Sequence, residues 1–382
     1  MIPYGRQSIS QADIDAVVEV LKSDFLTQGP AVTSFEQALA TKAGAKHAIA
    51  MSNATAALHV ACLALDLGPG DRLWTTPITF VASANCGRYC GATIDFVDIN
   101  PQTFNMCSDA LEQKLKQAEQ DGTLPKVIVA VHMGGQSPRM ERIAELARAY
   151  DIRIIEDASH AIGASYLGQP VGAGAHADIT VFSFHPVKII TAGEGGAALT
   201  NDANLAERME RLRSHGITRD QKLMVDESEG PWYYQQLELG LNYRMTDIQA
   251  ALGLCQLTRL DKFVARRREI ADAYDAALAD VALDVPGRLP GAESSWHLYV
   301  IRLHDQSRHR QAFEELRANG IGVNLHYIPV HLQPYYRQFG FGPGDFPASE
   351  NYYARAISVP MYPDLTDEMQ ATVVAAVTEV IG

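Results

Sequence analysis

The sequence predicts an α/β fold in which a buried, mostly parallel sheet is covered by helices and followed by a smaller α+β domain. Short apolar or β-branched runs alternate with helical stretches from about residue 10 to residue 250, which is typical of parallel strands joined by helices. The chain has 382 residues, more than one hydrophobic core usually supports. We therefore expect a large domain over residues 1–250 and a small domain over residues 251–382.

The first strand–helix unit carries the clearest local signals. Residues 47–51 form an apolar run, and Ser52 and Asn53 then provide the cap of a helix whose small and apolar residues recur at helical spacing. Gly68-Pro69-Gly70 ends this unit. Further buried strands are expected at 73–76, 93–97, 127–131, 153–156 and 179–184, with helices at 108–118 and 140–150.

The C-terminal part changes character. A long helical region is expected from residue 246 to about 279, followed by a strand at 296–303 and a helix at 308–319. Before it, residues 217–236 are polar and contain Gly230-Pro231. This segment is expected to be an exposed loop that could cover a site.

Composition excludes several classes of function. The formal charge of −13 argues against a nucleic-acid-binding or anionic-membrane surface, since those partners reward clustered Lys and Arg. No apolar run reaches membrane-spanning length, and the first residues show no basic segment leading into an apolar one. The 5 cysteines and 12 histidines have neither disulfide nor metal spacing. We therefore expect a cytoplasmic protein with no metal, nucleic-acid or membrane partner.

One stretch, residues 152–196, carries most of the chemistry. Asp157 ends a predicted strand, Ser183 ends another, and Lys188 follows in an apolar setting before a glycine-rich turn. Each group suits one part of pyridoxal 5'-phosphate: Asp157 the ring nitrogen, Ser183 the phosphate, and Lys188 the aldehyde carbon as a Schiff base. The alternative for Asp157 is a cap of the turn that begins at Ala158.

Other residues complete such a site. The helix start at Ala54 and Thr55 offers backbone N–H groups to a phosphate, although capping alone would also explain Asn53. Phe80 could stack on a ring, and His160 could lie beside the phenolic oxygen of the cofactor. Taken singly, an aromatic residue in an apolar run is usually core, and a lone histidine is usually structural.

With these residues in place, the chain resembles the sugar aminotransferases of the DegT/DnrJ/EryC1/StrS family, a branch of the fold-type I pyridoxal-phosphate-dependent transferases. The resemblance spans nearly the whole length. It is carried by segments at 20–36, 52–58, 77–80, 156–161, 183–188, 213–216, 240–244 and 247–253.

The resemblance implies roles for particular residues. Lys188 would be the catalytic lysine, Asp157 would bind the pyridine nitrogen, and Phe80 would stack on the ring. The phosphate would be held by Ala54, Thr55 and Ser183. It also implies a homodimer with shared active sites, in which Asn242 reaches the phosphate of the neighbouring subunit.

The expected substrate rests on four short segments that resemble one subgroup of the family. Residues 27–29, 135–137, 184–188 and 325–330 are most similar to the C4 aminotransferases of pseudaminic acid biosynthesis. These transfer the amino group of L-glutamate to a UDP-linked 4-keto-6-deoxy-N-acetyl sugar while the cofactor cycles through pyridoxamine 5'-phosphate. The candidate contacts of the nucleotide sugar, chosen by position in family-like segments, are Tyr4, Arg6, Thr27, His215, Tyr327 and His331.

Two alternatives remain at this point. One is an aminotransferase for a dTDP- or GDP-linked 3- or 4-keto-6-deoxy sugar, and the other is a pyridoxal-phosphate-binding regulatory protein without catalytic activity. The presence of Asp157, Ser183 and Lys188 together favours an enzyme.

Overall fold

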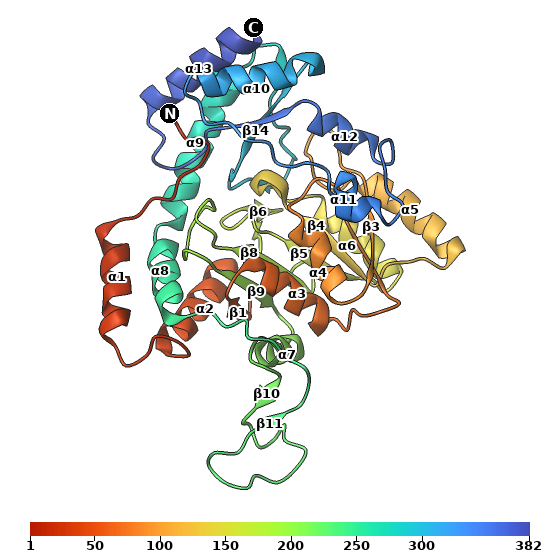
Figure 1. Ribbon diagram of the computed structural model, residues 1–382, viewed down its shortest axis with the longest axis vertical. Coiled ribbons are helices and arrows are strands. Elements are labelled where there is room, and N and C mark those ends of the chain that lie inside the picture. The colour runs from red at the N-terminus through yellow and green to blue at the C-terminus, as the bar shows by residue number, and fades with distance from the viewer.

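The structure is a computed structural model that describes residues 1–382 (Figure 1). A seven-stranded sheet forms the centre of the molecule. Six strands run in one direction and β9 runs against them. The predicted α/β architecture with a mostly parallel sheet is thus confirmed. In spatial order the strands are β1 (His47–Met51), β9 (Gly196–Thr200), β8 (Ile179–Ser183), β5 (Arg153–Asp157), β4 (Val127–Val131), β2 (Arg72–Thr75) and β3 (Thr93–Phe96).

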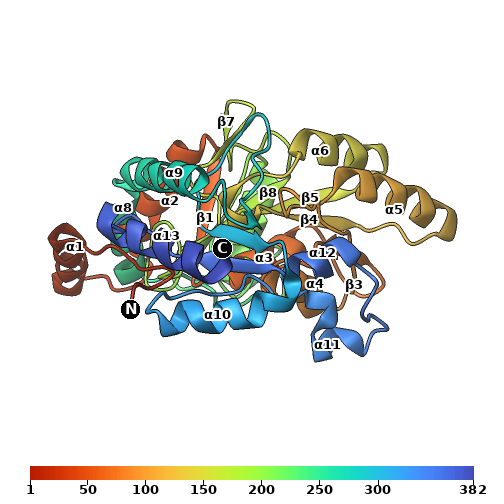
Figure 2. The same ribbon diagram turned by 90° about the horizontal axis from the view of Figure 1, so that it is seen from above.

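Successive side chains of the strands point to opposite faces of the sheet and pack into two separate hydrophobic cores. In β4, Val127 and Val129 join the core that contains α3 and α4, whereas Ile128 and Ala130 join the core under α5 and α6. Figure 2 shows these helix pairs on opposite sides of the sheet. The helices around the sheet are α1 (Gln11–Lys22), α2 (Pro30–Ala43), α3 (Ala54–Ala64), α4 (Ala82–Tyr89), α5 (Ser108–Asp121), α6 (Met140–Ala149), α7 (Ala203–Arg213) and α8 (Asp247–Leu257).

The C-terminal elements form a core of their own. Its buried residues all lie between Ile270 and Ile381, and Ile2 from the N-terminus packs against them. The division at residue 250 stays a prediction, because the segment also sends Tyr336 and Phe346 into the core of the large sheet. The elements are α9 (Leu260–Ala277), β12 (Leu283–Asp284), β14 (Tyr299–Leu303), α10 (His309–Ala318), α11 (Pro334–Arg337), α12 (Pro347–Tyr353), β15 (Ala356–Val359) and α13 (Asp367–Ile381).

Short elements connect these parts. A small antiparallel sheet joins the two halves of the chain, since β13 pairs with β6. The short elements are β6 (Ser165–Tyr166), β7 (Gln169–Pro170), β13 (Ala292–Glu293) and three 3₁₀ turns at Met133–Gly135, Gln306–Arg308 and Val330–Leu332.

Two predicted elements differ from the structure. The long helical region is interrupted: α8 ends where the Thr258 hydroxyl donates to the Cys255 carbonyl, and α9 begins at Leu260. The predicted strand at 296–303 begins only at Tyr299. Trp296 has a positive φ of 52°, and the Arg267 guanidinium takes the carbonyls of residues 296 and 297 that a strand neighbour would otherwise use.

The polar segment at 217–236 projects away from the body of the protein as a hairpin (Figure 1). Its base is closed by β10 (Ile217–Thr218) and β11 (Gln235–Gln236), which pair antiparallel. None of its residues lines the large cavity described below. The segment is an exposed loop, as predicted, but it does not cover the cavity of its own chain; whether it covers a site stays a prediction.

A buried carboxyl in the sheet makes the stability of the protein depend on pH. Glu156 lies in β5 and accepts a hydrogen bond from the Thr180 hydroxyl, with an Oγ1–Oε2 distance of 2.8 Å. Burial raises the pKa of Glu156 to about 7, although the Thr180 bond acts in the opposite direction. The folded protein therefore keeps a proton that the unfolded chain releases from about pH 4.3 upward, so stability falls as the pH rises toward 7.

We expect Glu156→Gln to remove this loss of stability at high pH, because glutamine has no proton to release. The free energy of unfolding should exceed that of the wild type by about 3 kcal/mol at pH 8 and by much less at pH 5, as measured by urea titration. The exposed Glu119→Gln serves as the control and should change neither value. An equal effect of Glu156→Gln at both pH values would contradict the explanation.

Candidate active site

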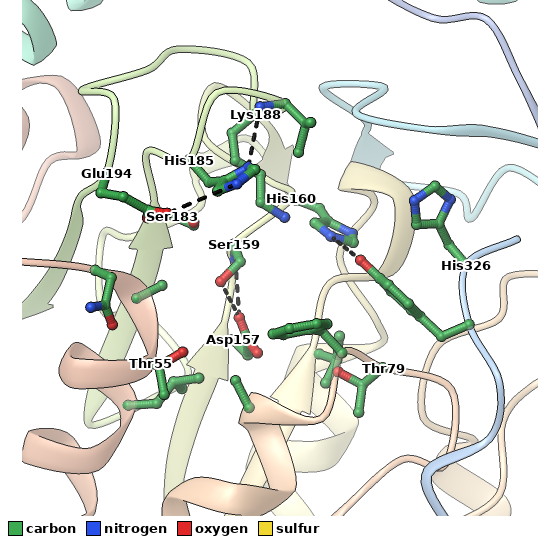
Figure 3. A pocket seen from close by; sticks show the side chains of 18 of the residues that line it. Thr55, Thr79, Asp157, Ser159, His160, Ser183, His185, Lys188, Glu194 and His326 are labelled. Carbon is green, nitrogen blue, oxygen red and sulfur yellow. Dashed lines mark hydrogen bonds and ion pairs between the residues drawn. The ribbon is translucent and has the colours of Figure 1, made fainter. Parts of the chain in front are cut away.

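A cavity of about 800 Å³ opens at the carboxyl ends of the parallel strands, beside the start of α3 (Figure 3). Val131, Asp157 and Ser183, the last residues of β4, β5 and β8, lie in its wall. This is the place where open α/β sheets bind ligands. The cavity is therefore the candidate active site.

The Asp157 carboxylate is held by three donors. Its Oδ2 accepts from the Ser83 hydroxyl at 2.6 Å, and its Oδ1 accepts from the Ser159 hydroxyl at 2.5 Å and the Ser159 N–H at 3.2 Å. Ser83 comes from α4, whereas Ser159 follows Asp157 by two residues. The carboxylate is buried, so its orientation is fixed from two sides before any ligand arrives.

Lys188 lies in the connection between β8 and β9. Its side chain is half-buried in the cavity wall. Loss of hydration lowers the pKa of the Lys188 amine to about 8, although Asp157 acts in the opposite direction. The connection itself is fixed, because the Thr191 hydroxyl donates to the Phe184 carbonyl at 3.1 Å and accepts from the Gly193 N–H at 3.0 Å. A rigid loop thus presents an amine that is readily deprotonated near neutral pH.

The start of α3 offers an anion site. Asn53 caps the helix by accepting the Ala56 N–H at 2.8 Å. The N–H groups of Ala54 and Thr55 have no partner within the helix and lie at its positive end. Gly196 of β9 permits this placement, since a Cβ there would lie 2.4 Å from the Ala54 nitrogen. Cavity-lining hydroxyls of Thr55 and Ser183 add further donors.

His160 and Tyr327 form one wall of the cavity. His160 Nδ1 accepts from the Gly134 N–H at 3.3 Å, and its Nε2 lies 3.2 Å from the Tyr327 hydroxyl. Burial, and then the charge of Lys188, lowers the pKa of His160 well below its usual value. The neutral ring therefore carries its proton on Nε2 and donates it to Tyr327. The exposed ring of Phe80 stands 6.1 Å from that of Tyr327.

The structure brings most of the predicted site residues together. Seven of the eight predicted cofactor contacts line this cavity, all except Asn242, and so do two of the six substrate candidates. These cavity-lining predicted residues are Tyr4, Ala54, Thr55, Phe80, Asp157, His160, Ser183, Lys188 and Tyr327.

Five predicted residues lie outside the cavity of their own chain. His331 is fully buried, and its Nε2 is 3.0 Å from Glu350 Oε1. Its interpretation as a substrate contact is wrong, because it is a core histidine. Arg6, Thr27, His215 and Asn242 do not line the cavity either. The last two lie at the base of the projecting hairpin, where Asn242 pairs with Ser214.

Sequence reasoning missed several lining residues. Ser159 could have been found, because a serine two residues after an aspartate commonly closes a turn through the carboxylate. Tyr243 and His326 carry no such local signal. Ser83 does not line the cavity itself but supports Asp157 from a position 74 residues away in the sequence. No group of three or more His, Cys, Asp or Glu side chains is placed to hold a metal ion.

The donor set fits pyridoxal 5'-phosphate. The cavity holds a buried carboxylate for a protonated ring nitrogen, a helix start with hydroxyls for a phosphate, and an amine of lowered pKa for the aldehyde. These three features line one cavity, as one bound molecule requires.

The comparison with known families decides the assignment. The sequence profile described as the DegT/DnrJ/EryC1/StrS aminotransferase family matches residues 7–378. The chain belongs to this family. The expected family and the fold-type I architecture are both confirmed.

Individual members of the family agree with the match. The "UDP-4-amino-4,6-dideoxy-N-acetyl-beta-L-altrosamine transaminase" of Campylobacter jejuni is 38% identical over 96% of this chain and 93% of its own. Helicobacter pylori PseC, an "aminotransferase involved in the biosynthesis of pseudoaminic acid", has a TM-score of 0.90 at 32% identity, covering 100% of this chain and 99% of that one.

A third family member bears on the cofactor. The PLP form of the putative sugar aminotransferase Spr1654 from Streptococcus pneumoniae has a TM-score of 0.89 at 30% identity, covering 99% of this chain and 98% of that one. The protein is thus a sugar aminotransferase, and pyridoxal phosphate is its cofactor. The alternative of a regulatory protein without activity is set aside. No helix is both long and apolar enough to cross a membrane.

Proposed function

We propose that the protein transfers the amino group of L-glutamate to C4 of a UDP-linked 4-keto-6-deoxy-N-acetyl sugar. The observation that supports this substrate most is the 38% identity with the Campylobacter jejuni UDP-sugar transaminase over nearly the full length of both chains. The structural likeness to PseC points to the same class of sugar. We also retain the prediction of a cytoplasmic location.

In this proposal the residues of the cavity have different roles in the reaction. Bound pyridoxal phosphate supplies the electron sink that accepts the electrons of the breaking Cα–H bond. Asp157 keeps a proton on the ring nitrogen, and the α3 start, Thr55 and Ser183 anchor the phosphate. Phe80 covers the ring from the exposed side of the cavity.

Lys188 has two roles in this proposal. Its Nζ would hold the cofactor covalently, and as a free amine it would take the proton from the donor Cα. The lowered pKa of about 8 keeps a substantial fraction of this amine neutral near pH 7 to 8, as a general base requires. With the sugar, the same amine returns a proton to C4.

We further propose a homodimer with shared sites. The projecting hairpin exposes Val225 and Trp232, and Leu239 is exposed at its base, which is unusual for large apolar residues without a partner. Asn242 stands beside this base and would reach the phosphate of the neighbouring subunit. The hairpin would then contact the partner and not its own cavity.

A substrate panel tests the proposal. L-glutamate is combined with UDP-, dTDP- and GDP-linked keto-sugars that carry the ketone at C3 or C4, and the products are identified by mass and NMR. We expect turnover of the UDP-linked 4-keto-6-deoxy-N-acetyl sugar and amination at C4. Turnover confined to dTDP- or GDP-linked sugars, or amination at C3, would establish the alternative.

A further inference from the structure

Three of the 5 cysteines gather where α3 packs against α4 (Figure 1). Cys62 lies on α3, and Cys86 and Cys90 lie one turn apart near the end of α4. All three are buried as free thiols in the same hydrophobic core. Cys62 is within hydrogen-bond reach of both of the others. The fold thus brings together thiols whose spacing in the sequence indicates no pairing.

Cys90 has the surroundings of a reactive thiol. Cys62 lies next to it, and so does His59, which is one turn before Cys62 on α3. The hydrogen bond with Cys62, and then the contacts with His59, lower the pKa of the Cys90 thiol, although burial acts in the opposite direction. Hydrogen bonds with Cys86 and Cys90 raise the pKa of the Cys62 thiol. Cys90 is therefore the nucleophilic thiolate of this pair, and Cys62 is its protonated partner.

His59 connects the three thiols to the active-site cavity. Its ring lies 5.3 Å from the ring of Tyr89 and 5.9 Å from the ring of Tyr243, and both tyrosines line the cavity. His59 Nδ1 is 3.4 Å from the Tyr243 hydroxyl. His59 is only half-buried, whereas Cys90 is 8% exposed. The side of His59 is thus the more open approach to the Cys90 sulfur.

We infer that Cys62 and Cys90 form a peroxide-responsive pair whose closure into a disulfide weakens cofactor binding. The Cys90 thiolate gives an electron pair to one oxygen of hydrogen peroxide, the O–O bond breaks, and hydroxide leaves. The Cys62 sulfur then attacks the resulting sulfenic sulfur, and the sulfenic hydroxyl leaves as water with the Cys62 proton. Two electrons pass from the thiols to the peroxide. Transient disulfides of this kind serve redox sensing in cytosolic proteins.

The disulfide would act on the cofactor through both helices. An S–S bond of about 2.0 Å is much shorter than a contact between unbonded atoms, so the end of α4 must move toward α3. The start of α3 carries the N–H groups that would bind the phosphate, and Ser83 on α4 donates to Asp157 at 2.6 Å. A shift between the helices therefore displaces groups that would bind opposite ends of the cofactor. This step rests on the proposed function, which gives Asp157 and the α3 start these roles.

The test treats the holoenzyme with hydrogen peroxide and compares Cys90→Ser with the matched control Cys107→Ser, which alters a thiol outside the cluster. Peptide mass mapping without reductant identifies the disulfide, and ultrafiltration measures cofactor release. In the wild type and the control we expect a bond between Cys62 and Cys90. The dissociation constant of pyridoxal phosphate should rise by about 10-fold or more, as for the loss of one hydrogen bond to a charged group. Dithiothreitol should reverse both changes, and Cys90→Ser should show neither.

Cys62→Ala provides an independent variant. It leaves His59 beside Cys90 but removes the thiol that closes the disulfide. Oxidation of Cys90 should therefore stop at the sulfenic acid, which dimedone traps and mass analysis detects. Because Cys62 is fully buried, the thermal midpoint of this variant is measured alongside.

Three outcomes would overturn the inference. They are a disulfide that joins Cys62 to Cys86, oxidation to sulfinic acid without any disulfide, and a complete disulfide between Cys62 and Cys90 with unchanged cofactor affinity. Failure of the proposed function looks different. In that case the reduced protein converts no UDP-linked keto-sugar, or Asp157→Asn leaves the cofactor affinity of the reduced protein unchanged, while peroxide still closes the disulfide.

Discussion

Replacing Lys188 with alanine is expected to abolish amino transfer, with a loss of at least about 10⁴-fold in the half reaction with glutamate. The reason is that, in the proposed function, one amine would provide both the covalent attachment and the proton transfer. The cavity has no other lysine or arginine to replace it. The rate is measured in single turnovers by cofactor absorbance, and borohydride reduction followed by mass analysis shows whether the cofactor is attached at residue 188.

The control for this variant is Lys262→Ala, which removes an exposed lysine on α9. It should keep full activity and covalent attachment. The loop hydrogen bonds made by Thr191 do not involve the Lys188 side chain, so Lys188→Ala should unfold at the wild-type temperature. Rapid transamination by a folded Lys188→Ala protein would refute the assignment.

The second large effect is expected at Asp157. Asp157→Asn keeps the shape of the side chain but removes the negative charge that would hold a proton on the cofactor ring. Both half reactions should slow by about 10²- to 10³-fold, similar to the loss of other preorganised electrostatic contacts. The rates are again read from cofactor absorbance, with glutamate and with the keto-sugar in separate experiments.

Ser159→Ala is the variant to compare with Asp157→Asn, because it weakens the support of the carboxylate without removing its charge. It removes the 2.5 Å hydrogen bond to Oδ1 but leaves the Ser83 bond to Oδ2 and the bond from the backbone N–H of residue 159 in place, so the carboxylate keeps its charge and two of its three donors. We expect a loss of about 10-fold or less. Wild-type rates in Asp157→Asn, or a larger loss in Ser159→Ala than in Asp157→Asn, would show that the charge of Asp157 is not what matters.

The fold was predictable where local signals suffice. The buried strand at Val127–Val131 has the expected bounds, and the α3 start follows Asn53 as its capping pattern predicts. The strand β9 was missed, because Gly196–Thr200 is rich in small residues that resemble a turn. The glycine at the start of this strand is explained only by packing, since the start of α3 lies directly against Gly196.

The candidate site shows the same limit. Asp157 and Ser183 were predicted from strand ends, and Lys188 from the turn that follows one. Tyr243 reaches the cavity, and Ser83 reaches the Asp157 carboxylate, through the packing of distant segments, which no local pattern records. His331 had a plausible position in the sequence but turned inward to Glu350. Side-chain direction in irregular segments depends on the whole fold.

The reversed direction of β9 has a consequence for the lysine loop. Because β9 returns beside β8, Ser183 and Gly196 face each other as a registered pair, and residues 184–195 form a loop closed at both ends by the sheet. At the base of this loop, Ser183 on one side has the hydroxyl that would bind the phosphate, and Gly196 on the other side contacts the start of α3. Any change in the length of this loop would alter the reach of Lys188 while leaving the anion site where it is. The chain would thus hold the cofactor phosphate at the ends of the sheet and carry the reactive amine on a separate loop.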